Sequence, residues 1–171
     1  MTVEEFTRVL RMRQSVRSFS PRPVGEDALG RIMEAGRLAA SAANRQPWKF
    51  FLLHREGREE FNLLLRPSFR AAPAIIVACA RPDKAWVRKE DGKNYGWVDV
   101  SIAVTEMVLA ATAEGLGTCW IAAFDPEAAR RILGLDDTWE PVTAVALGEP
   151  EKPLEMPAKK RKSLDEVWEV R

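Results

Sequence analysis

The stretch WVDVSIAVTEMVLAATAEG, residues 97–115, is apolar nearly all the way round when it is placed on a helix. A helix of that kind belongs at the centre of a domain or in an interface, because none of its faces suits water. Asp99, Glu106 and Glu114 interrupt the apolar run and argue against a membrane span. We therefore expect a central helix that stops at Gly115 and Gly117.

Apolar runs on both sides of this helix predict strands, and helical spacing between them predicts further helices. The expected strands are WKFFLL at 48–53, AAPAIIVACA at 71–80, TCWIAAF at 118–124 and VTAVALG at 142–148. The other expected helices cover 2–12, 26–39, 56–66 and 126–133. About four strands and five helices in this order indicate a layered α/β or α+β domain.

Capping signals place two of the helix starts. Thr2 with Glu5 forms a capping-box pattern, and Asp125 precedes Pro126 at the first position of its helix. In the helix over 26–39, the side chains expected to face inward are Leu29, Ile32, Met33 and Leu38.

Composition describes a single globular domain over 1–171 in which residues 149–171 form a proline-rich tail. A net charge of +1 argues against a dedicated nucleic-acid or membrane-surface protein. Cys79, Cys119 and the single His54 are too few for a cysteine–histidine zinc site or a disulfide framework. The N-terminus has no signal-peptide pattern, so we expect a cytoplasmic protein without a metal.

Four stretches can carry chemistry. In RMRQSVRSF, residues 11–19, Arg13 and Arg17 bracket Ser15, which suits an anion but also suits a solvated helix end. In SAANRQPWKF, residues 41–50, two side-chain amides can pair with a heterocycle. The glycines of EGLGTCWIAAFD, residues 114–125, allow close backbone approach, and residues 121–123 offer N–H groups to a ligand. AKKRKSLDEVWEV, residues 158–170, is either a disordered basic tail or an end that buries its apolar residues.

No arrangement of protein side chains suits nucleophilic or acid–base catalysis, so no catalytic residue is predicted. His54, in an apolar strand context, is more typical of a structural histidine. An enzyme with so few reactive groups is expected to use a bound cofactor.

Taken together, RQSVRSF, AASAANRQPWKF, GLGTCWIAAFDPE, ALGEP and KRKSLDEV resemble the successive motifs of the FMN-dependent nitroreductase family, from about residue 8 to 168. The resemblance implies an α+β sandwich with a mostly antiparallel central sheet flanked by helices. It also implies a homodimer with two FMN molecules at the interface. The long helix would then pack across the two-fold axis, and the tail would lie over the partner subunit.

The resemblance assigns roles to individual residues. Those implied to hold the FMN phosphate and pyrimidine edge are Arg13, Ser15 and Arg17, with Gln14 adjacent. The flavin contacts implied in the polar loop are Ser41, Asn44 and Gln46. The backbone implied to approach flavin N5 belongs to Trp120, Ile121, Ala122 and Ala123. Arg161 is implied to reach the phosphate, with Lys160 and Lys162 as alternates.

This chain departs from the family pattern at two places. Gln14 stands where many members carry a second basic residue, and Ala122-Ala123 stands where some carry a Glu-Gly pair. Trp86, Tyr95 and Trp97 are candidates to line the substrate pocket, although tryptophans near a central helix are more often part of the core.

The implied activity is electron transfer from NAD(P)H through FMN to nitroaromatics, quinones or similar electron-poor acceptors, with donor and acceptor using one pocket in turn. One alternative is a specialised enzyme of the same fold: a reductive dehalogenase, a flavin-cleaving enzyme or a metabolite dehydrogenase. Another is a binding module that engages nucleic acid or acidic partners through the basic tail.

Overall fold

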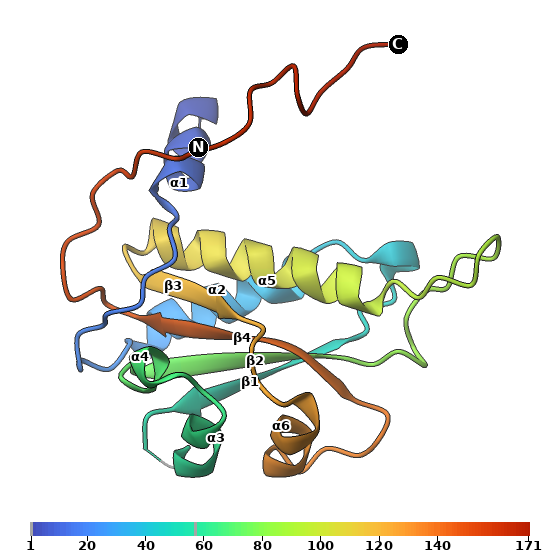
Figure 1. The fold of residues 1–171 in the computed structure, drawn as a ribbon, viewed down its shortest axis with the longest axis horizontal. Helices are drawn as coiled ribbons and strands as arrows, with labels where there is room; N and C mark the ends of the chain where they lie inside the picture. Colours follow the sequence, from blue (N-terminus) through green and yellow to red (C-terminus); the bar gives the residue numbers. More distant parts are fainter. Residues whose placement is uncertain (1, 57) are drawn as a thin grey trace.

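A four-stranded antiparallel sheet forms the middle layer of the molecule (Figure 1). The structure is a computed structural model and describes residues 2–56 and 58–171. The strands are β1 (Trp48–His54), β2 (Ala74–Ala80), β3 (Gly117–Ile121) and β4 (Glu140–Gly148), and they lie in the order β1-β2-β4-β3. All three neighbouring pairs are antiparallel, so the fold is α+β rather than α/β.

Helices cover both faces of this sheet (Figure 1). On one face lie α2 (Glu26–Leu38) and α5 (Gly96–Ala113), and on the other lie α3 (Glu59–Leu63), α4 (Pro67–Arg70) and α6 (Pro126–Ile132). Alternate residues of β2 serve the two faces: Ile76 packs in the core beneath α5, whereas Ile75 and Val77 pack in the other core. This two-sided burial explains why β2 is apolar at every position.

The expected central helix is confirmed as α5. Val100, Val104 and Met107 are buried, and α2 packs closely against the helix because Gly36 has no side chain. A Cβ at Gly36 would lie 2.7 Å from the Met107 side chain. Within the described residues α5 alone is long and apolar enough to cross a membrane, and half of it is buried inside the fold, as in a core helix.

The two expected caps are also confirmed. The Thr2 hydroxyl accepts from the Glu5 N–H while the Glu5 carboxylate accepts from the Thr2 N–H, at the start of α1 (Val3–Met12). The Asp125 carboxylate accepts from the N–H groups of Glu127 and Ala128, with Pro126 at the first helical position.

Three local expectations are wrong. Leu38 is 65% exposed, because α2 buries Gly36 instead near its C-terminal end. The helix expected over 56–66 is shorter, because Arg66 precedes Pro67 and adopts an extended conformation; within that span residue 57 lies outside the described residues. Two expected strands are too long: the strand expected to continue to residue 124 ends at Ile121, and the strand expected from residue 71 begins at Ala74.

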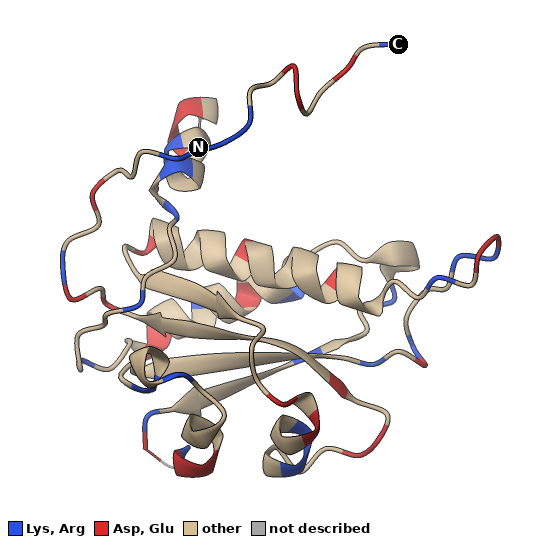
Figure 2. Cartoon of the chain, in the orientation of Figure 1, with Lys and Arg blue, Asp and Glu red and all other residues tan. Residues whose placement is uncertain are grey.

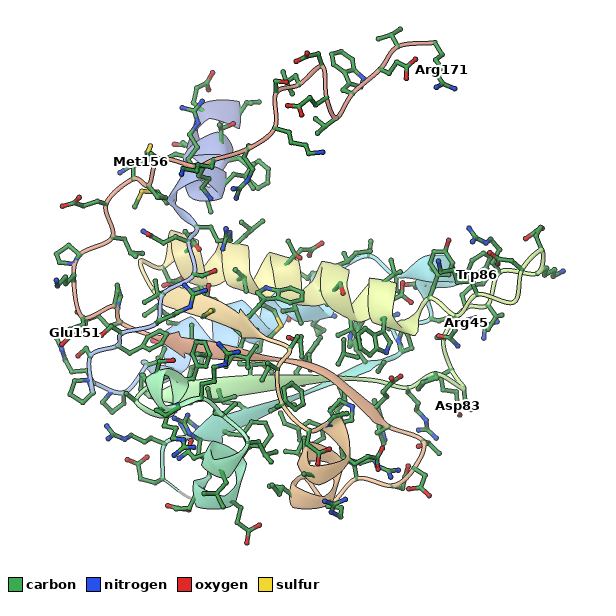
Figure 3. The ribbon with its side chains drawn as sticks, viewed as in Figure 1. Arg45, Asp83, Trp86, Glu151, Met156 and Arg171 are labelled. Carbon is green, nitrogen blue, oxygen red and sulfur yellow. The ribbon has the colours of Figure 1, made fainter. Side chains whose placement is uncertain are left out.

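Helix α1 and the part of the tail that passes it lie together, outside the main body, and the C-terminus extends away from them (Figure 1). No residue of α1 is buried, and Val3, Phe6 and Leu10 are exposed. The tail pairs first with residues 18–20 of its own chain: the Ser20 N–H donates to the Glu149 carbonyl at 2.8 Å. It then passes α1 at Met156 and runs outward to Arg171 (Figure 3).

Charged residues lie at the periphery of the fold (Figure 2). Most of α5 and of the strands is uncharged, with Lys49 in β1 and Glu140 at the start of β4 as the charged strand residues, whereas Lys, Arg, Asp and Glu gather on the other helices, the loop tips and the two chain ends. The exposed side of α5 is therefore unlike the rest of the surface.

Candidate functional site

Residues 13–17 lie alongside the first residues of β3. Ser15 forms a parallel bridge with Thr118, and the Val16 N–H donates to the Thr118 carbonyl at 2.9 Å. Gly117 permits this contact, because a Cβ there would lie 2.8 Å from the Val16 side chain. The close approach that Gly117 allows was expected to serve a ligand, but in the structure the Val16 side chain of this segment packs against Gly117 instead. The contact fixes the RQSVR motif next to β3.

A cluster of three cations lies at the end of this segment. The Lys159 ammonium donates a hydrogen bond to the Arg13 carbonyl, and its pKa is lowered by partial burial and by the charges of Arg13 and Arg161. Among the described residues, Arg13, Lys159 and Arg161 form no ion pair with a carboxylate. A cluster of cations without counter-charges can accept the negative charge of an anion.

Lys159 was missed by the sequence reasoning, which selected Arg161 with Lys160 and Lys162 as alternates. The run AKKRK predicts a basic cluster, but no local pattern in it indicates which side chain is directed toward the fold. In the structure Lys159 is half-buried, whereas Lys160 and Lys162 are exposed on the outgoing tail.

Gln14 and Arg17 lie in a groove of about 900 Å³ between residues 14–18 and the tail. The Gln14 amide donates to the Glu155 carbonyl at 3.1 Å, and the Arg17 guanidinium donates to the Ser15 carbonyl at 3.3 Å. Ser15 itself is exposed. Arg17 lines this groove and is not one of the charges that act on Lys159.

Four site residues predicted on and after β3 follow one another along the same edge. Trp120 is 38% exposed, and Ala122 and Ala123 are exposed just beyond the strand. The Ile121 side chain is buried in the core, so Ile121 offers a ligand only its backbone.

The polar loop with Ser41, Asn44 and Gln46 is strained and internally bonded. Ala43, Asn44 and Gln46 have φ angles of 52°, 52° and 49°, a left-handed conformation that side chains other than glycine adopt at a cost. The Ser41 hydroxyl accepts from the Gln46 N–H at 3.0 Å, and the Gln46 amide donates to the Asn44 side chain at 3.1 Å. Strain of this kind is often kept where a loop has a binding role.

Asp99, in the first turn of α5, holds this loop in place. One of its carboxylate oxygens accepts from the Ala42 N–H at 2.9 Å, and the other is buried without a hydrogen-bond partner. The residue is 1% exposed, and burial raises its pKa, while the bond from Ala42 opposes that rise. Asp99 was noted in the sequence only as an interruption of the apolar run, because no local signal links it to the loop.

The aromatic candidates separate into two groups. Trp86 packs edge-on against Tyr95, with ring centroids 5.0 Å apart, in a loop that projects from the N-terminal end of α5 (Figure 3). Trp97 is 53% exposed at the start of that helix and lines a cavity with Ala122.

The two halves of the predicted site lie at opposite ends of α5. Asp99 holds the 41–46 loop at the N-terminal end, near Arg45 in Figure 3, whereas residues 13–17 contact β3 just after the C-terminal end. An 18-residue helix is about 27 Å long at 1.5 Å per residue. Within one chain the structure therefore brings residues 13–17 to the start of β3 and Lys159 to Arg13, and it does not bring the 41–46 loop to them. Ala122, beyond the other end of β3, lies with Trp97 near the N-terminal end of α5.

The profile of the nitroreductase family matches residues 10–67 and 55–149. The chain belongs to the nitroreductase family. A relative from Archaeoglobus fulgidus, provisionally named an NADH dehydrogenase/NAD(P)H nitroreductase, is 31% identical over an alignment 157 residues long, and the match covers 86% of this chain and 87% of the relative. A 5,6-dimethylbenzimidazole synthase from Rhodobacter capsulatus is 25% identical over an alignment 202 residues long, gaps included, and the match covers 98% of this chain and 96% of that enzyme.

The three-dimensional comparison agrees with the family assignment. The crystal structure of a nitroreductase family protein from Clostridium difficile 630 superposes with a TM-score of 0.87 at 30% identity, covering 99% of this chain and 98% of the other. The nitroreductase fold expected from the motifs is thereby confirmed.

Proposed function

We propose that this nitroreductase is an FMN-dependent oxidoreductase that takes electrons from NAD(P)H and delivers them to nitroaromatics, quinones or similar electron-poor acceptors. The observation that carries the proposal is the cluster of Arg13, Lys159 and Arg161 beside β3. A phosphate monoester supplies the missing negative charge, and the guanidinium groups of arginine match its oxygens with paired hydrogen bonds.

The residues present fit an FMN molecule laid along β3. Arg13, Lys159 and Arg161 would hold the phosphate, with Lys160 and Lys162 as reserve cations on the tail. Ser15 and Arg17, with Gln14 adjacent, would lie at the pyrimidine edge, and the backbone of Trp120–Ala123 would line the ring. The chemistry supplied by a bound FMN is the acceptance of a hydride equivalent from NAD(P)H and its later release to the acceptor. Donor and acceptor would share one space in turn, which predicts ping-pong kinetics.

A second copy of the chain would complete the site. The exposed side of α5 carries an apolar stripe with Trp97, Val98 and Ile102, which borders a groove of about 510 Å³. Two copies packed through this stripe with antiparallel α5 helices would bring the 41–46 loop of one next to residues 13–17 of the other. This arrangement supports the proposal of a homodimer with each FMN between two subunits.

The chain ends would belong to the same interface. Leu164, Val167 and Trp168 are 63–73% exposed, and the apolar residues of α1 are exposed beside the tail. The first part of the 149–171 tail contacts residues 13 and 18–20 of its own chain. We therefore propose that its outer part, residues 160–171, lies over the partner subunit. The tail belongs to a single domain over residues 1–171. Both cysteines are free and buried, which suits the reducing cytoplasm.

The decisive experiment is spectroscopic. Protein purified with added FMN should keep flavin absorbance after dialysis, and NADH or NADPH should bleach it. Arg17→Ala should weaken FMN retention by about 1.5–3 kcal/mol, as for a charge-assisted hydrogen bond. A colourless protein would refute the proposal. A yellow protein that no nicotinamide bleaches would instead favour a specialised activity, which the resemblance to a 5,6-dimethylbenzimidazole synthase keeps as the second candidate.

The dimer is tested by a charge placed on the stripe. Ile102→Glu should give a monomer of 19.2 kDa in light scattering and should lose FMN at the same time, because the site would lack its second half. Leu63→Glu is the matched control, since Leu63 is 75% exposed on α3, on the opposite face of the fold. A monomeric Ile102→Glu variant that still binds FMN normally would contradict the shared site.

A further inference from the structure

Lys159 differs in its surroundings from the other two lysines of the run AKKRK. Its side chain is half-buried and its ammonium donates a hydrogen bond to the Arg13 carbonyl, whereas Lys160 and Lys162 are exposed. Partial burial and the charges of Arg13 and Arg161 lower the pKa of Lys159. More of this side chain is therefore the neutral amine near neutral pH, and the neutral amine is the form that acts as a nucleophile.

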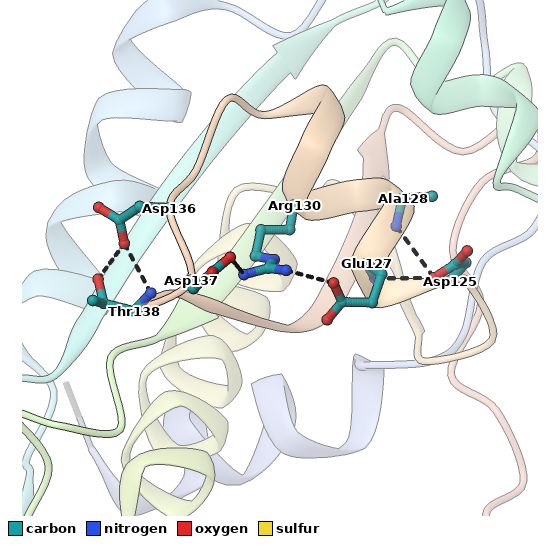
Figure 4. Close-up of polar contacts among 7 residues, drawn as sticks. All are labelled: Asp125, Glu127, Ala128, Arg130, Asp136, Asp137 and Thr138. Carbon is teal, nitrogen blue, oxygen red and sulfur yellow. Dashed lines mark hydrogen bonds and ion pairs between the residues drawn. The ribbon is translucent and has the colours of Figure 1, made fainter.

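The two arginines beside Lys159 carry charge that no carboxylate of the described residues engages. Arg130, by contrast, forms ion pairs with two carboxylates (Figure 4). The Arg161 guanidinium donates to the Lys160 carbonyl at 2.7 Å, and a guanidinium has further N–H groups to donate. Guanidinium groups match the oxygens of a phosphate with paired hydrogen bonds. The Lys159 amine therefore lies beside a place that suits a phosphate.

An acyl phosphate combines the two groups that this arrangement suits, a phosphate and an acyl carbon open to attack by an amine. We infer that acyl phosphates modify Lys159: their phosphate binds to Arg13 and Arg161 while the Lys159 amine attacks the acyl carbon. A bond forms between the nitrogen and the acyl carbon. The bond from that carbon to the phosphate oxygen breaks, and the oxygen keeps the electron pair. The proton that the nitrogen loses goes to the departing inorganic phosphate, and nothing is oxidised or reduced.

Acylation of Lys159 and binding of FMN would exclude each other. The product of acylation is a neutral amide, so the cluster of Arg13, Lys159 and Arg161 loses one of its cations. A bound FMN phosphate would in turn occupy the guanidinium groups that the acyl phosphate needs. Chains without cofactor are then the ones modified, and a modified chain loads FMN poorly. This mutual exclusion rests on the proposed function, whereas the acylation itself does not.

Peptide mass spectrometry tests the acylation. The full chain, purified without added FMN, is incubated with acetyl phosphate, and Lys160 and Lys162 are internal controls on the same run of sequence. Lys159 should be acetylated at least about tenfold faster than either, and inorganic phosphate should suppress that difference. The N-hydroxysuccinimide ester of acetic acid, which carries no phosphate, should favour Lys159 far less. Arg161→Gln should remove the preference for Lys159 with acetyl phosphate, whereas Arg171→Gln, at the end of the same tail, should keep it.

Three outcomes would overturn the inference: equal acetylation of the three lysines, a preference for Lys159 that is as large with the ester as with acetyl phosphate, or a preference that survives in Arg161→Gln. Flavin absorbance after incubation with FMN reports separately on the proposed function, and a protein that stays colourless leaves the acetylation pattern to decide the inference alone. Where FMN binds, its presence during the reaction should protect Lys159. Acetylation of Lys159 that is unchanged by bound FMN would refute the mutual exclusion.

Discussion

Replacement of Asp99 by Asn and by Ala separates the two roles of this buried carboxylate. Both variants remove its charge, but only Asn keeps an oxygen that accepts from the Ala42 N–H, a bond of 2.9 Å in the structure. A buried N–H left without an acceptor costs about 1–3 kcal/mol. Asp99→Ala should therefore be less stable than Asp99→Asn by about 1–3 kcal/mol. At about 2–4 °C per kcal/mol for a chain of this size, the Tm values should differ by about 2–12 °C.

The wild type should differ from Asp99→Asn in a pH-dependent way. Burial raises the pKa of Asp99, so the folded chain binds this proton more tightly than the unfolded chain does. The stability contributed by Asp99 is then fully present below the unfolded pKa of about 3.9, and it falls as pH rises through the folded pKa. The advantage of Asp99→Asn over the wild type should grow across that window and then remain constant.

Urea unfolding of the three proteins at several pH values checks both statements. Equal midpoints for Asp99→Ala and Asp99→Asn would show that the bond to Ala42 contributes nothing. A difference between wild type and Asp99→Asn that does not change with pH would refute the assignment of a raised pKa. Since the 41–46 loop is held by this bond, Asp99→Ala should also retain FMN less well than Asp99→Asn.

Three further predictions concern a packing contact, a buried guanidinium and the charge of Lys159. Gly148→Ala should lower the free energy of unfolding in urea by about 1–3 kcal/mol, because its Cβ would lie 2.4 Å from Pro73. Gly30→Ala, which has open space around it, is the control and should raise the free energy of unfolding by about 0.5–1 kcal/mol. Equal urea midpoints for the two variants would contradict the packing at Gly148. Arg58 is 2% exposed, and its guanidinium donates to the carbonyls of Arg70 and Ala72. Arg58→Met should lower the free energy of unfolding by at least about 2 kcal/mol, because these carbonyls would lose their donor. A variant as stable as the wild type would show that these bonds do not stabilise the fold. The pKa of Lys159 is lowered, so FMN binding should weaken as pH rises, beginning below the ordinary lysine pKa of about 10.4. Lys159→Arg should abolish this pH dependence of FMN affinity. A pH dependence that persists in the variant would show that Lys159 does not hold the FMN.

Local patterns were sufficient for much of the fold. The capping box at Thr2, the Asp125 cap and the apolar runs of β1, β2 and β4 depend on neighbours within a few residues, and each lies where it was predicted. The error at Leu38 comes from a contact between two helices. Leu38 was predicted to face inward from its spacing alone, but α2 packs so closely on α5 that Gly36 is the residue buried near the C-terminal end of α2.

The five motif stretches were also sufficient to indicate the nitroreductase family, because they follow one another in the family's order along the chain. They did not indicate which parts meet. The sequence alone determined the local elements, the motif residues and the presence of a basic cluster at 159–162. Only the tertiary structure decided that Lys159 turns toward Arg13, that Asp99 holds the 41–46 loop, and that this loop lies one helix length away from residues 13–17. The reason is physical: contacts between residues distant in sequence depend on how α5 packs, and no side chain signals its distant partners locally.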